Sequence, residues 1–137
     1  MSFEVEVRSA GGDATALGNA GSYTLVVDRR ADAGGRGLGF NGGELLYLAV
    51  GGCVSNDLYR EARARGISLT DVRIIVHGDF AGDPPVSKEI SYEVALAGDA
   101  PPDQLQALVA EVDAIAEIPN SLGRGTSVRL SDVQISS

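Results

Sequence analysis

The chain has 137 residues and a mass of 14.1 kDa, and 44% of its residues are hydrophobic, which is typical of one globular domain with a substantial core. We therefore expect a single domain over residues 1–137. Acidic residues outnumber basic residues by 19 to 11, giving a formal net charge of −8, and the Lys and Arg residues form no cluster. This charge balance argues against binding to nucleic acid or to an anionic membrane surface.

The counts of cysteine and histidine exclude several kinds of site. One cysteine excludes an internal disulfide, and one cysteine with one histidine excludes a Cys/His zinc site within a single chain. The sequence carries neither a phosphate-binding loop nor a serine-hydrolase motif, so we expect no metal and no cofactor. The start of the chain lacks the basic and apolar regions of a signal peptide, and no apolar run approaches the ~18 residues of a membrane span. We expect a cytoplasmic protein with a reduced thiol.

The first third of the chain predicts short strands. Apolar and acidic residues alternate over residues 3–7, a short strand is expected over residues 15–17, and a further alternating stretch covers residues 23–27. Residues 31–43 are rich in glycine and are expected to form a connecting loop. The glycines of this loop do not follow the G-x-G-x-x-G order, so they give little support to a dinucleotide site.

A long helix is predicted over residues 44–66, which contain no proline. Its first half is apolar almost all the way round, which is typical of a helix buried on most of its surface. Gly66 suits the left-handed position that ends a helix. Gly51 and Gly52 each cost the helix about 1 kcal/mol relative to Ala, and close approach of another backbone is the simplest reason to keep them. A homodimer that encloses this helix would explain both features.

The second half of the chain predicts a hairpin, a helix and a last strand. Residues 72–76 and 90–96 alternate in the manner of strands, with a turn at residues 81–85 between them. A second helix opens at Pro101 and is expected to end at Ile118-Pro119, and a final strand is expected over residues 128–135. The order of elements indicates an α+β fold with a largely antiparallel sheet, a long buried central helix and a second helix.

Cys53, in the apolar half of the long helix, is the main candidate for chemistry. A free cysteine is most often a small buried hydrophobe, but a nearby cation can lower its pKa and make it reactive. Glu44 lies nine positions earlier, which at 100° per residue puts it on the opposite side of a straight helix, so the two meet only across a dimer interface or through a bend. The charges that could tune Cys53 are Glu44, Asp57, Arg29, Arg30 and Arg36. His77 is expected to be a half-exposed sheet residue without a catalytic role.

The run Gly-Phe-Asn-Gly-Gly-Glu-Leu-Leu-Tyr-Leu-Ala-Val-Gly-Gly-Cys over residues 39–53 resembles the signature of the OsmC/Ohr superfamily. That superfamily comprises osmotically inducible protein C and the organic hydroperoxide resistance proteins. The order of elements resembles the family over nearly the whole chain. The resemblance implies an intertwined α+β homodimer with the long helices at its centre and sites at the subunit interface.

The resemblance also implies a thiol peroxidase that acts on small organic hydroperoxides in oxidative or osmotic stress. Cys53 matches the family's peroxidatic cysteine, and Glu44 approximately matches its glutamate. The second, resolving cysteine would fall just before Pro119, where this chain has Ile118, and Asp13 stands where the family's arginine follows a Gly-Gly pair. A one-cysteine cycle would need an external thiol as reductant.

Two alternatives stay open at this point. The first is a non-catalytic homodimer on the same fold with a ligand-binding or structural role. The second is a redox sensor that signals through an intermolecular disulfide.

Overall fold

The computed structural model describes residues 1–136, and the chain forms two compact units, Met1–Leu48 and Ala49–Ser137. Helix α1 (Gly42–Ala64) begins in the first unit and continues into the second. The fold is α+β, as the order of elements predicted, with three α-helices and antiparallel sheets among the described residues.

The first unit holds a three-stranded antiparallel sheet with the order β1-β2-β3. Its strands are β1 (Glu6–Ser9), β2 (Ala16–Ala20) and β3 (Tyr23–Val27). The third strand has the predicted bounds, the second is longer than predicted, and the first begins at Glu6, not at Phe3. Pairing explains the late start, because Glu6 lies opposite Asn19 and the chain reverses at Gly21, so Phe3 has no residue of β2 opposite it.

The glycine-rich segment after β3 is ordered against the end of that strand. It contains a short 3₁₀ turn, η1 (Ala31–Ala33), and then returns so that Phe40 forms a parallel bridge with Val27. A Cβ atom at Gly39 would lie 2.1 Å from the carbonyl oxygen of Val26, so only glycine fits there. This close return of the backbone fixes where α1 begins.

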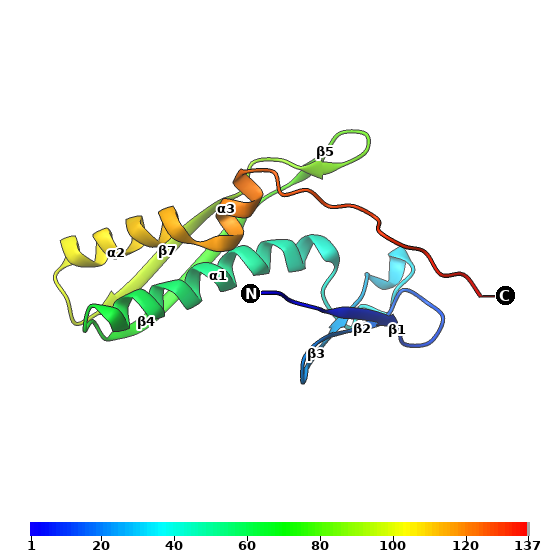
Figure 1. Ribbon diagram of the computed structural model, residues 1–137, viewed down its shortest axis with the longest axis horizontal. Coiled ribbons are helices and arrows are strands. Elements are labelled where there is room, and N and C mark those ends of the chain that lie inside the picture. The colour runs from blue at the N-terminus through cyan, green and yellow to red at the C-terminus, as the bar shows by residue number, and fades with distance from the viewer. Residues whose placement is uncertain (137) are drawn as a thin grey trace. The chain divides into compact units, whose positions relative to one another are not determined.

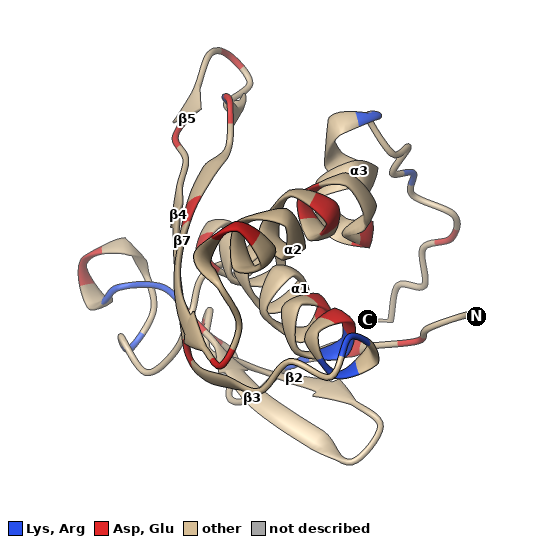
Figure 2. Ribbon diagram, turned by 90° about the vertical axis from the view of Figure 1, so that its left-hand side faces the viewer, with Lys and Arg blue, Asp and Glu red and all other residues tan. Residues whose placement is uncertain are grey.

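The second unit is built on a long antiparallel pair, β4 (Leu69–His77) and β7 (Ser91–Gly98). The small hairpin β5 (Phe80–Ala81) and β6 (Val86–Ser87) connects the two long strands through the predicted turn. Figures 1 and 2 show α1 and α2 (Pro102–Ile115) on the same side of the β4–β7 sheet. The predicted hairpin and second helix are therefore confirmed.

The core of the second unit lies where α1 meets α2. Side chains one turn apart on each helix are buried together, and partly buried residues of β4 and β7 pack against them. The buried cluster comprises Val54, Leu58, Ala62, Leu108, Val112 and Ala116. At the end of α1, Gly66 adopts a left-handed conformation with φ of 69°, as predicted.

The predicted end of the second helix at Ile118-Pro119 is wrong. After a break at Ala116, a third helix, α3, covers Glu117–Gly123. Proline is tolerated there because Pro119 lies in the first turn, where a backbone N–H has no partner within the helix. The sequence pattern predicted the end of helical structure at Pro119, but a new helix begins at Glu117 after the break at Ala116.

The predicted final strand over residues 128–135 is also wrong, because the described residues 126–136 form no helix or strand. Val128, Leu130 and Ile135 are 94%, 81% and 89% exposed. Alternation of apolar residues predicts a face that needs burial, but a strand also needs a partner with free backbone groups. No strand within residues 1–136 pairs with this segment.

Candidate functional site

Cys53 lies near the middle of α1 and is half-buried, with its side chain packed against the core of the second unit. The next residue, Val54, is fully buried in that core, so Cys53 lies at the edge of the core. A thiol in this position is held by packing and keeps part of its surface outside the core. It is the only cysteine of the chain.

The two glycines before Cys53 have different surroundings. A Cβ atom at Gly51 would lie 3.3 Å from Cγ2 of Val76 on β4, which is a tight contact. At Gly52 no described atom would lie within 4 Å of an added Cβ. Among the described residues, the neighbour of Gly51 is therefore a side chain of the sheet, so close packing of α1 on β4 accounts for this glycine. Close approach of a partner's backbone to Gly52 stays a prediction.

Asp57 follows Cys53 by one helical turn and is a buried acid in the second unit. Only 9% of its side chain is exposed. Its Oδ1 atom lies 3.0 Å from Nη1 of Arg60, while its Oδ2 atom is buried without a hydrogen-bond partner among the described residues. Asp57 was among the charges expected to tune Cys53. Arg60 was missed, although its i,i+3 spacing from Asp57 is a signal for such a pair.

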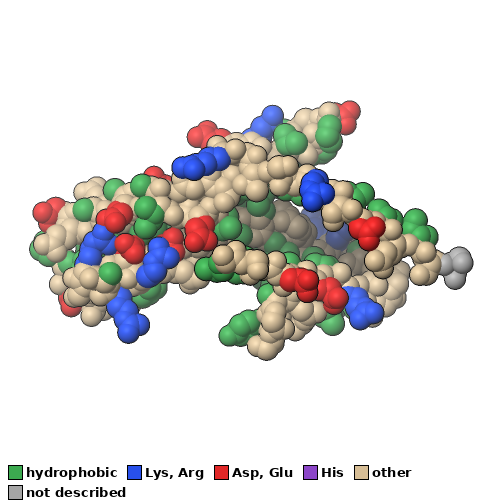
Figure 3. Space-filling model, in the orientation of Figure 1, with side chains coloured by type: hydrophobic (Ala, Val, Ile, Leu, Met, Phe, Trp, Pro, Cys, Tyr) green, Lys and Arg blue, Asp and Glu red, His purple; other side chains and the backbone are tan. Residues whose placement is uncertain are grey.

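Arg60 belongs to a group of charged residues over the end of α1. Arg60 also contacts Glu61, and Arg65 pairs with both Glu61 and Glu111 of α2. Figure 3 shows basic and acidic side chains lying together over this part of the second unit. The contacts with Glu61 and the charge of Asp57 raise the pKa of Arg60, so its guanidinium is charged throughout the physiological range.

Glu44 has a structural partner at the start of α1. Its backbone N–H donates to the side-chain oxygen of Asn41 at 2.8 Å, and its carboxylate accepts from the backbone N–H of Asn41 at 3.0 Å. This reciprocal pair is a capping box, which satisfies donors that the first turn of a helix leaves free. Asn followed three residues later by Glu is the sequence signal of this pair, although the role was not predicted from it. A catalytic role for Glu44 beside Cys53 stays a prediction.

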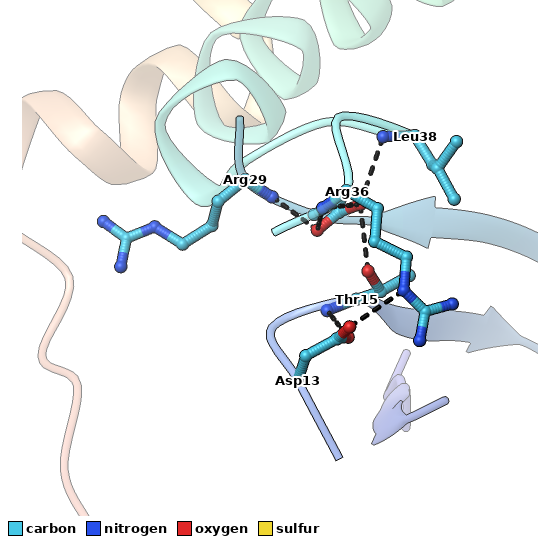
Figure 4. Close-up of polar contacts among 6 residues, drawn as sticks. Asp13, Thr15, Arg29, Arg36 and Leu38 are labelled. Atoms are coloured by element: carbon cyan, nitrogen blue, oxygen red, sulfur yellow. Dashed lines mark hydrogen bonds and ion pairs between the residues drawn. The ribbon is translucent and has the colours of Figure 1, made fainter. Parts of the chain in front are cut away.

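Asp28 is the most heavily hydrogen-bonded acid of the first unit, and it was not among the residues predicted to form a site. Asp28 is 1% exposed and directly follows Val27, the last residue of β3. Figure 4 shows the groups that converge on its carboxylate: the backbone N–H groups of Arg29, Arg36 and Leu38 and the hydroxyl of Thr15. Burial raises the pKa of Asp28, but the hydrogen bonds outweigh burial and hold it below its ordinary value. This carboxylate therefore organises the loop that follows it.

Arg36 is carried by that loop, and its Nε atom lies 2.8 Å from Oδ2 of Asp13. The pKa of Asp13 is lowered, chiefly by the backbone N–H of Thr15 and further by Arg36. Asp13 is the residue that stands at the position of the family arginine in the sequence comparison above. An arginine is thus present beside that position, supplied by another part of the same unit.

The model of the OsmC-like protein family matches residues 34–131, which include α1, Cys53 and all that follows up to α3. The chain belongs to the OsmC-like protein family. No protein of curated function matches its sequence.

Solved structures of OsmC-like proteins share the fold at low identity. The OsmC-like protein of Mycoplasma pneumoniae has a TM-score of 0.77 at 14% identity, with 92% of this chain and 89% of that one covered. The organic hydroperoxide resistance protein OhrB of Bacillus subtilis has a TM-score of 0.60 at 16% identity, with coverage of 92% and 93%. The organic hydroperoxide resistance protein OsmC of Legionella pneumophila has 0.58 at 20% identity, with coverage of 91% and 90%. These similarities support the fold.

Ile118, which stands where the family's second cysteine was expected, lies in the first turn of α3 and is half-buried. An aliphatic side chain there cannot form a disulfide with Cys53. The replacement of the family's second cysteine by Ile118 therefore lies in α3, the helix that was not predicted from the sequence.

The remaining candidates carry no further site. The Nε2 atom of His77 lies 2.8 Å from Oε2 of Glu93, and both side chains are exposed on the β4–β7 sheet. No group of three metal-ligating side chains occurs within residues 1–136. Across the same residues, no helix combines the length and apolarity needed to cross a membrane.

Proposed function

We propose that this OsmC-like protein is a single-cysteine thiol peroxidase that reduces small organic hydroperoxides with an external thiol. The observation that carries the proposal is Cys53, the only thiol, half-buried on the long helix of an OsmC-like fold behind the Gly51-Gly52 pair. The name of OhrB of Bacillus subtilis as an organic hydroperoxide resistance protein supports this substrate class.

The proposed reaction begins with loss of the Cys53 thiol proton to solvent. The thiolate attacks the distal oxygen of the hydroperoxide, so an S–O bond forms and the O–O bond breaks. Sulfur is oxidised to the sulfenic acid, and the remaining oxygen leaves as an alkoxide that takes a proton from water. Glu44 is proposed to help organise the thiolate, in keeping with the family resemblance.

Reduction of the sulfenic acid is proposed to use two molecules of a small external thiol. Because Ile118 replaces the second cysteine, the sulfenic acid has no thiol of its own chain to react with. The first external thiol forms a mixed disulfide with Cys53 and releases water. The second releases Cys53 as a thiol and leaves as the external disulfide.

The test is hydroperoxide consumption with cumene hydroperoxide and an excess of a monothiol, comparing the wild type with Cys53→Ser. We expect turnover in the wild type and only background in the variant. Intact-mass measurement after peroxide treatment should show one added oxygen, which can be assigned to Cys53 because no other cysteine competes. Equal consumption by both proteins would overturn the proposal.

We also propose that the protein acts as a homodimer. Large apolar side chains of the first unit are open to solvent: Val5 before β1, and Val7 and Tyr23 in the sheet, are exposed by 68%, 63% and 81%, and Leu48 on α1 by 52%. Several exposed apolar side chains in one unit support a surface that a partner covers. Light scattering with size-exclusion chromatography should give about twice 14.1 kDa. Leu48→Glu is expected to shift the protein toward the monomer.

The second candidate function is a non-catalytic homodimer that binds an apolar ligand. One observation favours it: the sheet of the first unit and Leu45 line a pocket of about 240 Å³ whose walls are almost entirely apolar. If this candidate is right, an apolar fluorescent probe will bind, the Cys53→Ser variant will bind it equally well, and peroxide will leave the thiol unmodified.

A single domain over residues 1–137 and a cytoplasmic location stay predictions.

A further inference from the structure

Within the second unit, the Oδ2 atom of Asp57 lacks a hydrogen bond although it is buried. A buried carboxylate oxygen without a donor is costly, and native structures pair such atoms with a protein group, a water or a ligand. Arg60 contacts the other oxygen, Oδ1, and thereby holds the carboxylate in place. Oδ2 of Asp57 is therefore a fixed hydrogen-bond acceptor with no donor among the described residues.

The position of Asp57 on α1 puts this acceptor beside Cys53. Residues four apart lie on the same face of a helix with Cβ atoms about 5–6 Å apart. Helical side chains also lean toward the N-terminus, so we expect the side chain of Asp57 to extend over the turn that contains Cys53. The Cys53 thiol itself is not the donor, since Oδ2 has no partner among the described side chains.

We infer that Asp57 is a substrate-positioning residue whose Oδ2 atom accepts the hydrogen bond of the hydroperoxide O–H group that Cys53 attacks. This inference rests on the proposed function and adds to it the residue that orients the substrate. Cys53 and Asp57 lie one helical turn apart on the same face of α1. An acceptor there selects a hydroperoxide, which carries an O–H group on its reactive oxygen, over a dialkyl peroxide, which does not.

The inferred hydrogen bond fixes the distal oxygen in front of the sulfur. As the S–O bond forms and the O–O bond breaks, the hydrogen held by Asp57 stays on the oxygen that becomes the sulfenic acid hydroxyl. The alkoxide leaves on the far side and is protonated by water. In this step Asp57 only accepts a hydrogen bond and forms no covalent bond.

A substitution at Asp57 can change the general reactivity of the Cys53 thiol as well as the placement of the substrate. The two effects are separated by a second reagent that attacks the thiol but has no hydrogen bond to give. The ratio of the two rates then reports the hydrogen bond alone.

The experiment compares the wild type, Asp57→Leu and Asp57→Asn in two reactions of Cys53 over a range of pH. One is oxidation by cumene hydroperoxide, and the other is modification by methyl methanethiosulfonate, which has no hydrogen-bond donor. Leu has nearly the shape of Asp. Removal of one partner of an ion pair is costly when the other charge stays buried, but the side chain of Arg60 is 57% exposed to solvent. Arg60 keeps its contact with Glu61 in these variants. Asp71→Leu, at an exposed position of β4, is the matched control.

For Asp57→Leu, we expect the ratio of the peroxide rate to the methanethiosulfonate rate to fall at least about tenfold, the loss of one charge-assisted hydrogen bond. Asp57→Asn, which keeps a weaker acceptor, should fall in between, and Asp71→Leu should match the wild type. An unchanged ratio in Asp57→Leu, with a wild type that is oxidised, would overturn this inference alone. A wild type that reacts with methanethiosulfonate but not with hydroperoxide would overturn both the inference and the proposed function.

Discussion

Leu58 is the residue whose truncation tests the description of the core most directly. It is 0% exposed and lies at the centre of the cluster that joins α1 to α2. Leu58→Ala removes three carbon atoms, worth about 2.4 kcal/mol of transfer free energy at about 0.8 kcal/mol per buried CH₂. The cavity left behind adds to this loss, so we expect the free energy of unfolding to fall by about 3–5 kcal/mol.

Urea denaturation followed by circular dichroism measures this change, with the slope m checked for constancy between variants. The matched control is Ile115→Ala on α2, because Ile115 is 43% exposed and its truncation leaves no closed cavity. The control should lose less than half as much stability as Leu58→Ala. Equal losses, or a loss below about 1 kcal/mol at Leu58, would show that the helices do not pack as described.

Three further changes have defined outcomes. Gly52→Ala should raise the free energy of unfolding by about 1 kcal/mol, because no described atom would lie within 4 Å of the added Cβ. Gly51→Ala should raise the free energy of unfolding by less, because Cγ2 of Val76 would lie 3.3 Å from its Cβ. A less stable Gly52→Ala variant would instead indicate that a partner's backbone lies against Gly52. Asp28→Asn should lower the free energy of unfolding at neutral pH. Because the folded-state pKa of Asp28 is lowered, the extra stability of the wild type should be lost as the pH falls below about 4. Urea denaturation of both proteins at several pH values measures this difference. Glu44→Gln keeps the capping box, so stability should stay within about 0.5 kcal/mol while the peroxidase rate falls; an unchanged rate would assign Glu44 to capping alone.

Local patterns in the sequence were sufficient for the elements that depend on near neighbours. Alternation over residues 23–27 and 90–96 and the 3.6-residue period in α2 identified β3, β7 and that helix. The motif over residues 39–53 was sufficient for the family, because it records the start of α1 and the cysteine in one run. The peroxidatic role proposed for Cys53 rests on the same motif and stays a prediction.

Elements that depend on a distant partner were not predictable in this way. Residues 128–135 alternate like a strand, yet no strand in the described part of the chain pairs with them. Pro119 looks like a helix stop, yet it also fits the first turn of a new helix, and only the position of α3 decides between the two. A local pattern determines which face needs burial but not whether a partner is available.

The sequence by itself therefore determined the fold class, the long helix and its single thiol, because periodicity, glycine positions and one motif are properties of neighbouring residues. Only the tertiary structure decided the surroundings of the acids. It brings Thr15 and three backbone N–H groups to Asp28, and it leaves Oδ2 of Asp57 buried one turn from Cys53 without a donor. The burial and the hydrogen bonds of a carboxylate depend on segments far apart in the chain. Burial and hydrogen bonding in turn determine its pKa and its possible partners.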